Sequence, residues 1–372
     1  MGQKNAQRFD VLDSWRGIAA LIVAFGHLKT NGLLSTLPIS STSFRFVDFF
    51  FVLSGFVISF SSGDRLILGI SEVKRFLIRR IVRLWPLHIF VLGLFLVHQI
   101  VLLAANLLEI VQEPIAFSEE FSPLYLLQNL LLVQAWETTP FPTWNKPAWS
   151  ISTEMFAYGL FAFISVILRR FAKIAVLVVA CVGLVAATIT PDIMTATFTM
   201  AIARCCTGFA CGVVVFHLFR TFQSVSLPYT TAIECVATLA ILACVMFLPP
   251  AAGVLILPVC CVAVFIFALE QGGISSLLKR QVFAFLGTRS YSIYMIHPFV
   301  LLSLLSTAAV LGIVGSLPDG KAGLILHPIL ADAITIAYIA VVVAASHFTY
   351  CRIEVPSSDL LLRKTQLSDA DK

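Results

Sequence analysis

Long apolar runs constrain the fold of this chain more than any other feature of its sequence. Such runs, each about twenty residues long, recur from near Trp15 to near residue 350, and that length lets an α-helix cross the hydrocarbon core of a membrane. Hydrophobic residues make up 59% of the 372 residues and charged residues only 12%, whereas a soluble domain carries about 25% charged residues. The sequence therefore predicts an integral membrane protein.

The apolar runs predict an all-α fold, a polytopic transmembrane helical bundle of about ten spans. The expected spans are residues 15–37, 46–63, 84–106, 149–168, 174–190, 196–219, 229–249, 251–270, 285–308 and 327–350. Residues 122–135 are apolar but too short to span, so they are expected to be re-entrant or interfacial. We assign residues 1–14 to a cytoplasmic N-terminal tail, residues 15–350 to the membrane domain, and residues 351–372 to a cytoplasmic C-terminal tail that is expected to be disordered after Pro356.

The basic residues predict the orientation of the chain, because they cluster at the ends of the apolar runs. With the N-terminus in the cytoplasm, the expected outer segments hold only Lys29, Arg45, Lys146 and Lys321 among the lysines and arginines. This bias follows the positive-inside rule and places both termini in the cytoplasm. It also accounts for the net charge of +5, so no nucleic-acid partner is expected. The first apolar run is too long for the core of a signal peptide, and it is expected to remain a span.

The nine cysteines are expected to be buried apolar side chains rather than ligands or cross-links. None forms a C-x-x-C pair, no histidine cluster accompanies them, and all but Cys351 lie within apolar runs. This pattern predicts neither a disulfide framework nor a metal site.

The first expected span carries two ionisable residues, Arg16 and His27. Their separation of eleven residues brings them to nearly the same helix face, about 16 Å apart along the axis. An arginine at the cytoplasmic surface suits a phosphate, and a buried imidazole suits a general base. The alternatives are that Arg16 merely extends to lipid headgroups and that His27 makes a hydrogen bond between packed helices.

Two further clusters follow in the second and third expected spans. Asp48 precedes the Phe-rich run FFFVLSGF, in which Ser54 and Gly55 form a small-residue patch. That patch indicates either a helix-packing seam or a narrow ligand channel. The third span is preceded by a basic cluster formed by Arg79, Arg80 and Arg83. This cluster is typical of an orientation signal, and it would also suit a clamp for polyphosphate.

The segment WSISTEMFAY, residues 149–158, begins the fourth expected span. Glu154 lies about one turn inside the expected outer surface, with Trp149, Ser150, Ser152 and Tyr158 nearby. A carboxylate among hydroxyls in a membrane favours a sugar-binding group or a partner for His27. The alternative is a glutamate at the interface with access to water.

The segment LGTRSYSIYMIHPF, residues 286–299, makes the ninth expected span the most polar of the bundle. Its candidate site residues are Ser290, Tyr291, Tyr294 and His297. Arg204, inside the sixth expected span, is a further candidate and is expected to pair with a carboxylate, because an unpaired charge in a membrane is costly.

Six motifs in order resemble those of the acyltransferase-3 family of membrane acyltransferases. They are LDSWRGIAALIVAFGH (12–27), RFVDFFFVLSGFVIS (45–59), RRIVRLWP, WSISTEMFAY, LGTRSYSIYMIH and YCRIEVP (350–356). The resemblance covers residues 10 to 356. It implies a ten-span enzyme that takes an acyl group, usually acetyl, from cytosolic acyl-CoA and acylates carbohydrate at the outer face.

The resemblance also implies roles for individual residues. The Arg-x10-His pair of the family falls on Arg16 and His27, with His27 as the expected catalytic residue. Its other motifs fall on Ser54 and Gly55, on the arginines at 79, 80 and 83, and on Glu154 as the intramembrane glutamate.

We therefore expect a multi-pass O-acyltransferase of the bacterial inner membrane. It would acylate a hydroxyl of an extracytoplasmic glycan or glycolipid, with acetyl-CoA as co-substrate and no permanently bound cofactor. Both direct transfer with His27 as general base and a covalent acyl-His27 intermediate stay open. The bilayer, acyl-CoA and the glycan are the expected partners, and a homo-oligomer is compatible with the sequence. The alternative function is a polytopic transporter or a polysaccharide export subunit.

Overall fold

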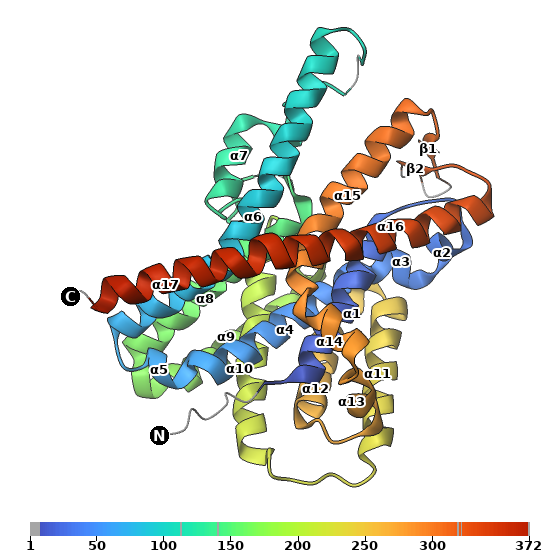
Figure 1. Cartoon of the computed structure of the whole chain (residues 1–372). Helices are drawn as coiled ribbons and strands as arrows, with labels where there is room; N and C mark the ends of the chain where they lie inside the picture. Colours follow the sequence, from blue (N-terminus) through green and yellow to red (C-terminus); the bar gives the residue numbers. More distant parts are fainter. Residues whose placement is uncertain (1–7, 112–113, 140, 318–319, 321, 371–372) are drawn as a thin grey trace.

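The computed structural model describes residues 8–111, 114–139, 141–317, 320 and 322–370, and it confirms an all-α helical bundle (Figure 1). Its helices are α1 (Asp10–His27), α2 (Leu33–Thr36), α3 (Pro38–Thr42), α4 (Phe46–Ile58), α5 (Asp64–Leu66), α6 (Ile70–Leu107), α7 (Pro123–Leu130), α8 (Trp149–Leu168), α9 (Ala172–Ile189), α10 (Ala201–Phe222), α11 (Thr230–Phe247), α12 (Ile256–Leu269), α13 (Gly273–Leu278), α14 (Gln281–Thr288), α15 (Ser290–Val310), α16 (Pro328–Thr349) and α17 (Val355–Ala370). A short antiparallel ribbon of β1 (Val314–Ser316) and β2 (Ala322–Leu324) joins α15 to α16.

Among the described residues, eight helical segments are long and apolar enough to cross a membrane. One of them, Lys146–Ile189, contains both α8 and α9, which contact each other on either side of a break at Arg169. Helix α1 is not among the eight, and it carries Asp10, Asp13 and Arg16. The structure thus confirms a polytopic helical bundle, and the count of ten spans remains a prediction.

Two segments differ from their predicted form. The first apolar run is not one helix to residue 37, because α1 ends at His27 and the chain turns through α2 and α3. The C-terminal tail, expected to be disordered, instead continues from α16 as the helix α17. Its Ser358 hydroxyl donates to the Val82 carbonyl of α6 at 3.2 Å, so packing against α6 supports this helix.

Segments predicted to lie on the same side of the membrane contact one another. At the expected cytoplasmic end, Arg220 in the last turn of α10 pairs with Asp64 of α5 at 2.9 Å. At the expected outer end, the Leu324 amide of β2 donates to the Lys29 carbonyl beyond α1 at 3.0 Å. Both contacts agree with the predicted sides, and the side that faces the cytoplasm remains a prediction.

Helices α4 and α10 pack closely because glycines line their interface. A Cβ atom added at Gly55 would lie 2.0 Å from the Phe209 carbonyl oxygen, and one added at Gly212 would lie 1.9 Å from that of Val52. Small residues allow such close backbone approach between membrane helices. Gly55 therefore belongs to a helix-packing seam, the first of its two interpretations.

Candidate functional site

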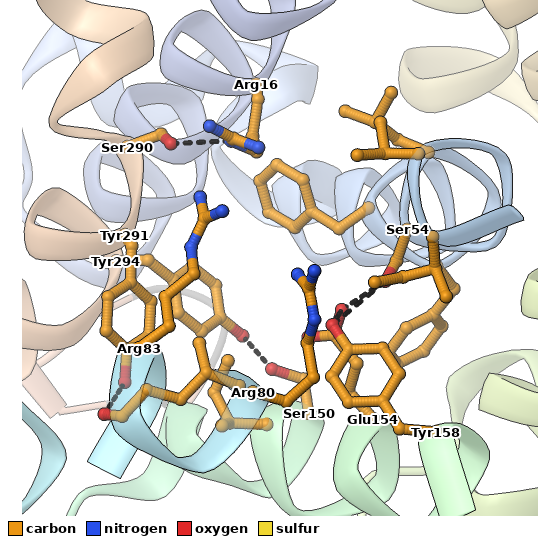
Figure 2. Close-up of a pocket in the computed structure, with 17 residues that line it drawn as sticks. Arg16, Ser54, Arg80, Arg83, Ser150, Glu154, Tyr158, Ser290, Tyr291 and Tyr294 are labelled. Atoms are coloured by element: carbon orange, nitrogen blue, oxygen red, sulfur yellow. Dashed lines mark hydrogen bonds between the residues drawn. The ribbon is translucent and has the colours of Figure 1, made fainter. Parts of the chain in front are cut away.

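A cavity of about 120 Å³ lies among α1, α4, α6, α8 and α15. Its polar lining consists of Arg16, Ser54, Arg80, Arg83, Ser150, Glu154, Tyr158, Ser290, Tyr291 and Tyr294. Apolar side chains complete the wall, most of them from α4, with Leu84 of α6 and Ile151 of α8. Side chains from five helices far apart in the sequence thus meet in one space, as Figure 2 shows.

Three arginines supply the positive charge of this cavity, and they differ in how well they are bonded. Arg16 donates to the Ser290 hydroxyl at 2.7 Å and pairs with Asp13 at 3.0 Å. The Nε atom of Arg80 is buried and has no hydrogen-bond partner. Arg83, exposed, lines the same cavity one helical turn further along α6, and Figure 2 shows all three guanidinium groups turned toward a common space.

Glu154 lies in the same cavity as these arginines. The hydroxyls of Ser54 and Tyr158 both donate to its Oε1 atom, and the two hydroxyl oxygens are 3.1 Å apart. The first turn of α8, just before Glu154, is buried inside the bundle, and the expected position of Glu154 near the outer surface stays a prediction. The structure also gives Glu154 these two hydroxyl partners rather than the expected partner His27.

The tyrosines of α15 are fixed by hydrogen bonds to backbone carbonyls. Tyr291 donates to the Leu84 carbonyl of α6 at 2.6 Å. Tyr294 donates to the Pro147 carbonyl at 3.0 Å and lies 2.9 Å from the Ser150 hydroxyl. These contacts join α15 to α6 and α8, so the wall of the cavity is rigidly held.

His27 and His297 lie together, outside the lining of the cavity. Their ring centroids are 4.9 Å apart, and the His297 ring is 5.8 Å from that of Tyr294, which does line the cavity. His297 is fully buried. His27, at the end of α1, keeps exposed surface although protein atoms crowd its ring, and its depth in the membrane stays a prediction.

Asp48 and Arg204 form a buried ion pair away from the cavity, as predicted for Arg204. Two parallel bonds join them, Nε to Oδ1 at 2.8 Å and Nη2 to Oδ2 at 2.9 Å. The third nitrogen of Arg204 donates to the Ala196 carbonyl at 3.0 Å, and its guanidinium lies 5.5 Å from the Trp149 ring centroid. All charged groups of this pair are satisfied, so Asp48, Arg204 and Trp149 support the fold rather than line the site.

Two other predicted site residues also lie outside the cavity. Arg79 is exposed on α6 and is not part of the lining. The Ser152 hydroxyl is buried, donates to the Leu132 carbonyl at 2.8 Å and accepts from the Ala135 amide at 3.2 Å. Ser152 therefore holds the loop before α8 in place.

Two residues of this region were not assigned to the predicted site. Ser150, which the sequence places near Glu154, lines the cavity one turn before it, and this spacing of four residues on α8 was the signal for including it. Glu354 is buried behind the cavity, accepts a hydrogen bond from Ser292 at 2.6 Å, and lies within electrostatic range of the cavity arginines. Its place in the YCRIEVP motif was the available signal.

The cysteines and other potential ligands form no site of their own in the part of the chain that the structure describes. All nine cysteines are free thiols. No group of three or more His, Cys, Asp or Glu side chains among the described residues is arranged to hold a metal ion.

Comparison with known proteins gives one match that covers most of the chain. A family model described as an acyltransferase domain matches residues 9–347. "Protein 2 in picA locus" of Rhizobium radiobacter is 36% identical over 107 residues, which are 29% of this chain and 54% of that protein. "Acyltransferase MdmB" of Streptomyces mycarofaciens is 29% identical over 163 residues, 41% of this chain and 38% of that protein. The matches thus span about half or less of these relatives, and no solved structure matches the chain.

Proposed function

The chain belongs to the acyltransferase-3 family, whose domain covers residues 9–347, and on this premise we propose that it transfers an acetyl group from cytosolic acetyl-CoA to an extracytoplasmic glycan or glycolipid. The acceptor would be a hydroxyl group, which makes the protein a membrane O-acetyltransferase. Both relatives come from bacteria, and this supports the bacterial inner membrane as its location.

The observation that carries this proposal is the cavity in which three arginines converge. Coenzyme A carries phosphate groups at one end, and a guanidinium binds phosphate through parallel, charge-assisted hydrogen bonds. Arg80 has a buried nitrogen without a partner, which a phosphate oxygen would satisfy. Arg83 and Arg16 flank the same space, so they would hold the remaining phosphate charge.

The opposite wall of the cavity suits the uncharged arm of the donor. Glu154 accepts from two hydroxyls, and its second carboxylate oxygen could accept an amide N–H of pantetheine. Tyr294 and Ser150 lie beyond it on the cavity wall. Since the His297 ring contacts Tyr294, a donor that extends along this wall would bring its thioester toward the two histidines.

The transfer step needs a base at the end of this path, and His27 is the group we propose. His27 has exposed surface, through which a hydroxyl from outside the cavity would reach its ring. His27 would remove the hydroxyl proton while the oxygen attacks the thioester carbonyl and the C–S bond breaks. An acetyl-His27 intermediate is the second route to the same product.

The test is transfer of radiolabelled acetyl from acetyl-CoA, measured in membranes that contain the wild type or a His27→Ala variant. Loss of a general base lowers turnover by about 100- to 10,000-fold, so label should enter carbohydrate only with intact His27. His217→Ala is the matched control, because His217 lies on α10 and does not line the cavity.

Two results would contradict the proposal. Full labelling of carbohydrate by His27→Ala would exclude both routes through this residue. No labelling by the wild type, with an acceptor-rich extract and a panel of acyl-CoA donors, would exclude the transferase and favour the transporter alternative.

A further inference from the structure

The cavity ends toward the histidines at two aromatic rings, Phe50 of α4 and Tyr294 of α15. On α15 the lining reaches Tyr294 but does not include His297, about one turn further along. On α4 the lining begins at Phe50. The centroids of these two rings are 5.8 Å apart, and their planes are inclined at 86° in an edge-to-face contact. This aromatic pair therefore borders the end of the cavity that lies nearest to His297.

The arginines lie on the other side of the aromatic pair. Arg16 donates to the hydroxyl of Ser290, which begins α15 one turn before Tyr294. His297 follows Tyr294 on α15, and its ring contacts both Tyr294 and His27. Along α15 the order is thus arginine, aromatic pair, histidines. A donor whose phosphates are held by the arginines would bring its opposite end, the acyl thioester, to the aromatic pair.

The two rings of the aromatic pair differ in how firmly they are held. The Tyr294 hydroxyl donates to the Pro147 carbonyl at 3.0 Å and lies 2.9 Å from the Ser150 hydroxyl (Figure 2). Phe50 has no polar atom in its side chain, and it keeps exposed surface although its neighbours Phe49 and Phe51 are buried. The space at this end of the cavity is therefore determined by the side chain at position 50.

The backbone that carries Phe50 has no room to retreat from a larger group. Helix α4 lies against α10 with backbone contacts at Gly55 and Gly212, where an added Cβ atom would lie about 2 Å from a carbonyl oxygen of the other helix. The ion pair between Asp48 and Arg204 joins the same two helices two residues before Phe50. Because α4 is held in this way, a longer acyl chain would have to displace the Phe50 ring itself.

We propose that Phe50 determines which acyl group is transferred, because its ring fills the space that a chain longer than acetyl would need. This inference rests on the proposed function, and it adds the residue that selects the donor. The methyl group of acetyl would lie against the ring, and each further methylene would meet it. A pocket that excludes one extra methylene discriminates by about 10- to 200-fold.

The experiment offers two donors at once to membranes that contain the full-length protein and an acceptor-rich extract. Acetyl-CoA competes with propionyl-CoA or butyryl-CoA, each carrying a different label, and the ratio of labelled products gives the ratio of the kcat/KM values. The wild type should prefer acetyl over butyryl by about 10-fold or more. Phe50→Ala should lower this preference by at least about 10-fold, and Phe50→Leu by a smaller factor, in the order of the volume removed.

Val57→Ala is the matched control. Val57 also lines the cavity, on the same face of α4 but two turns away from Phe50. Its loss removes apolar volume without opening the end of the cavity at the aromatic pair, so the preference for acetyl should equal that of the wild type. Thermal melting of each variant checks its folding, and Phe50→Leu decides the question if Phe50→Ala does not fold.

Three results would overturn the role of Phe50. The first is a wild type that transfers butyryl as readily as acetyl. The second is a folded Phe50 variant with the wild-type preference. The third is an equal loss of preference in Val57→Ala, which would indicate a general loosening of α4.

A His27→Ala variant in the same assay separates this inference from the proposed function. An inactive His27→Ala beside an unchanged preference in Phe50→Ala overturns the role of Phe50 alone. An active His27→Ala beside a lowered preference in Phe50→Ala removes the proposed base and supports Phe50 as the selecting residue. A wild type that transfers no acyl group from any of the three donors overturns both.

Discussion

Arg204 and Arg80 are both arginines inside the helical bundle, yet their surroundings differ. Arg204 directs two nitrogens to Asp48 and the third to a carbonyl, and no part of its side chain is exposed. Arg80 has a buried Nε atom with no partner and lines a cavity with two further arginines. The protein itself supplies partners for all three nitrogens of the Arg204 guanidinium, whereas the Nε atom of Arg80 has none.

This difference distinguishes residues that support the fold from those proposed to bind the donor. An ionisable group in a membrane is costly and usually marks function, but that rule alone does not say which function. Asp48 and Ser54 illustrate the point, because both are polar residues of α4. Asp48 pairs with α10, while Ser54 faces the cavity and donates to Glu154.

The largest effect is expected on stability, from a change that breaks the buried pair. Asp48→Ala leaves the Arg204 charge buried without its partner, and such a loss destabilises a protein by about 3–5 kcal/mol. The variant should unfold at a much lower temperature or denaturant concentration in detergent. Thermal melting of the purified protein measures this change.

A matched double variant makes that test specific. Replacing both partners by apolar side chains, Asp48→Leu with Arg204→Met, removes the unpaired charge and should recover most of the lost stability. Its affinity for coenzyme A should equal that of the wild type. A folded Asp48→Asn variant that has lost coenzyme A binding would instead assign Asp48 to the site.

For the cavity arginines, substitution is expected to lower the affinity for coenzyme A and to leave stability unchanged. Arg80→Gln and Arg83→Gln should each weaken coenzyme A binding by about 10- to 100-fold, because each removes a charge-assisted bond to phosphate. Their melting temperature should stay close to that of the wild type, since in Arg80 the lost group has an unpaired nitrogen. Isothermal titration with coenzyme A measures the affinity.

Arg79→Gln is the control within the same motif, because Arg79 is exposed outside the cavity. Its affinity for coenzyme A should change by less than about 2-fold, as for most surface substitutions. An equal loss of coenzyme A affinity in all three variants would contradict the assignment of Arg80 and Arg83 to the donor. It would instead indicate that the total positive charge of the segment attracts coenzyme A.

The fold could be predicted largely from the sequence because lipid permits few solutions. Backbone groups in a bilayer must be bonded within a helix, so an apolar run fixes a helix, as for the expected span 174–190 and the observed α9. The end of α1 could not be predicted in this way. The chain leaves the helix after His27 since Lys29 bonds to Leu324, a contact nearly three hundred positions away in the sequence.

The candidate site was predicted less completely than the fold. Its polar residues differ from those that support the fold in the side chains they bond to, and not in residue type. The sequence indicated Arg16, Glu154 and His27, but the pairing of Glu154 came out differently. Asp48 and Ser54 are six positions apart, which places them about 120° apart around a helix. They could therefore have been assigned to different faces, but the residue facing Asp48 could be named only from the structure.

A smaller loss of stability is expected at the contact between α4 and α10. Helix α4 carries both Asp48 of the buried ion pair and Ser54 of the cavity. Gly55→Ala would drive a Cβ atom to within 2.0 Å of the Phe209 carbonyl, and such overpacking costs about 1–3 kcal/mol. Gly159→Ala on α8 is the control, because nothing lies within 4 Å of its added Cβ atom. The first variant should melt earlier, and the second should match or exceed the wild type. Equal melting temperatures would show that α4 can move away from α10 at no cost.

The smallest effects are expected from the loss of single hydroxyl groups, one that lines the cavity and one that supports the fold beside it. Tyr158→Phe removes one of two donors to Glu154, and Ser54 retains the other, so kcat/KM for acetyl-CoA should fall by about 2- to 10-fold. Ser152→Ala removes a buried bond to the loop before α8, so it should lower the melting temperature and leave kcat/KM of the folded enzyme unchanged. If Ser152→Ala lowers kcat/KM more than Tyr158→Phe does, the loop before α8 belongs to the site, and the division between satisfied and unsatisfied polar groups no longer separates scaffold from function.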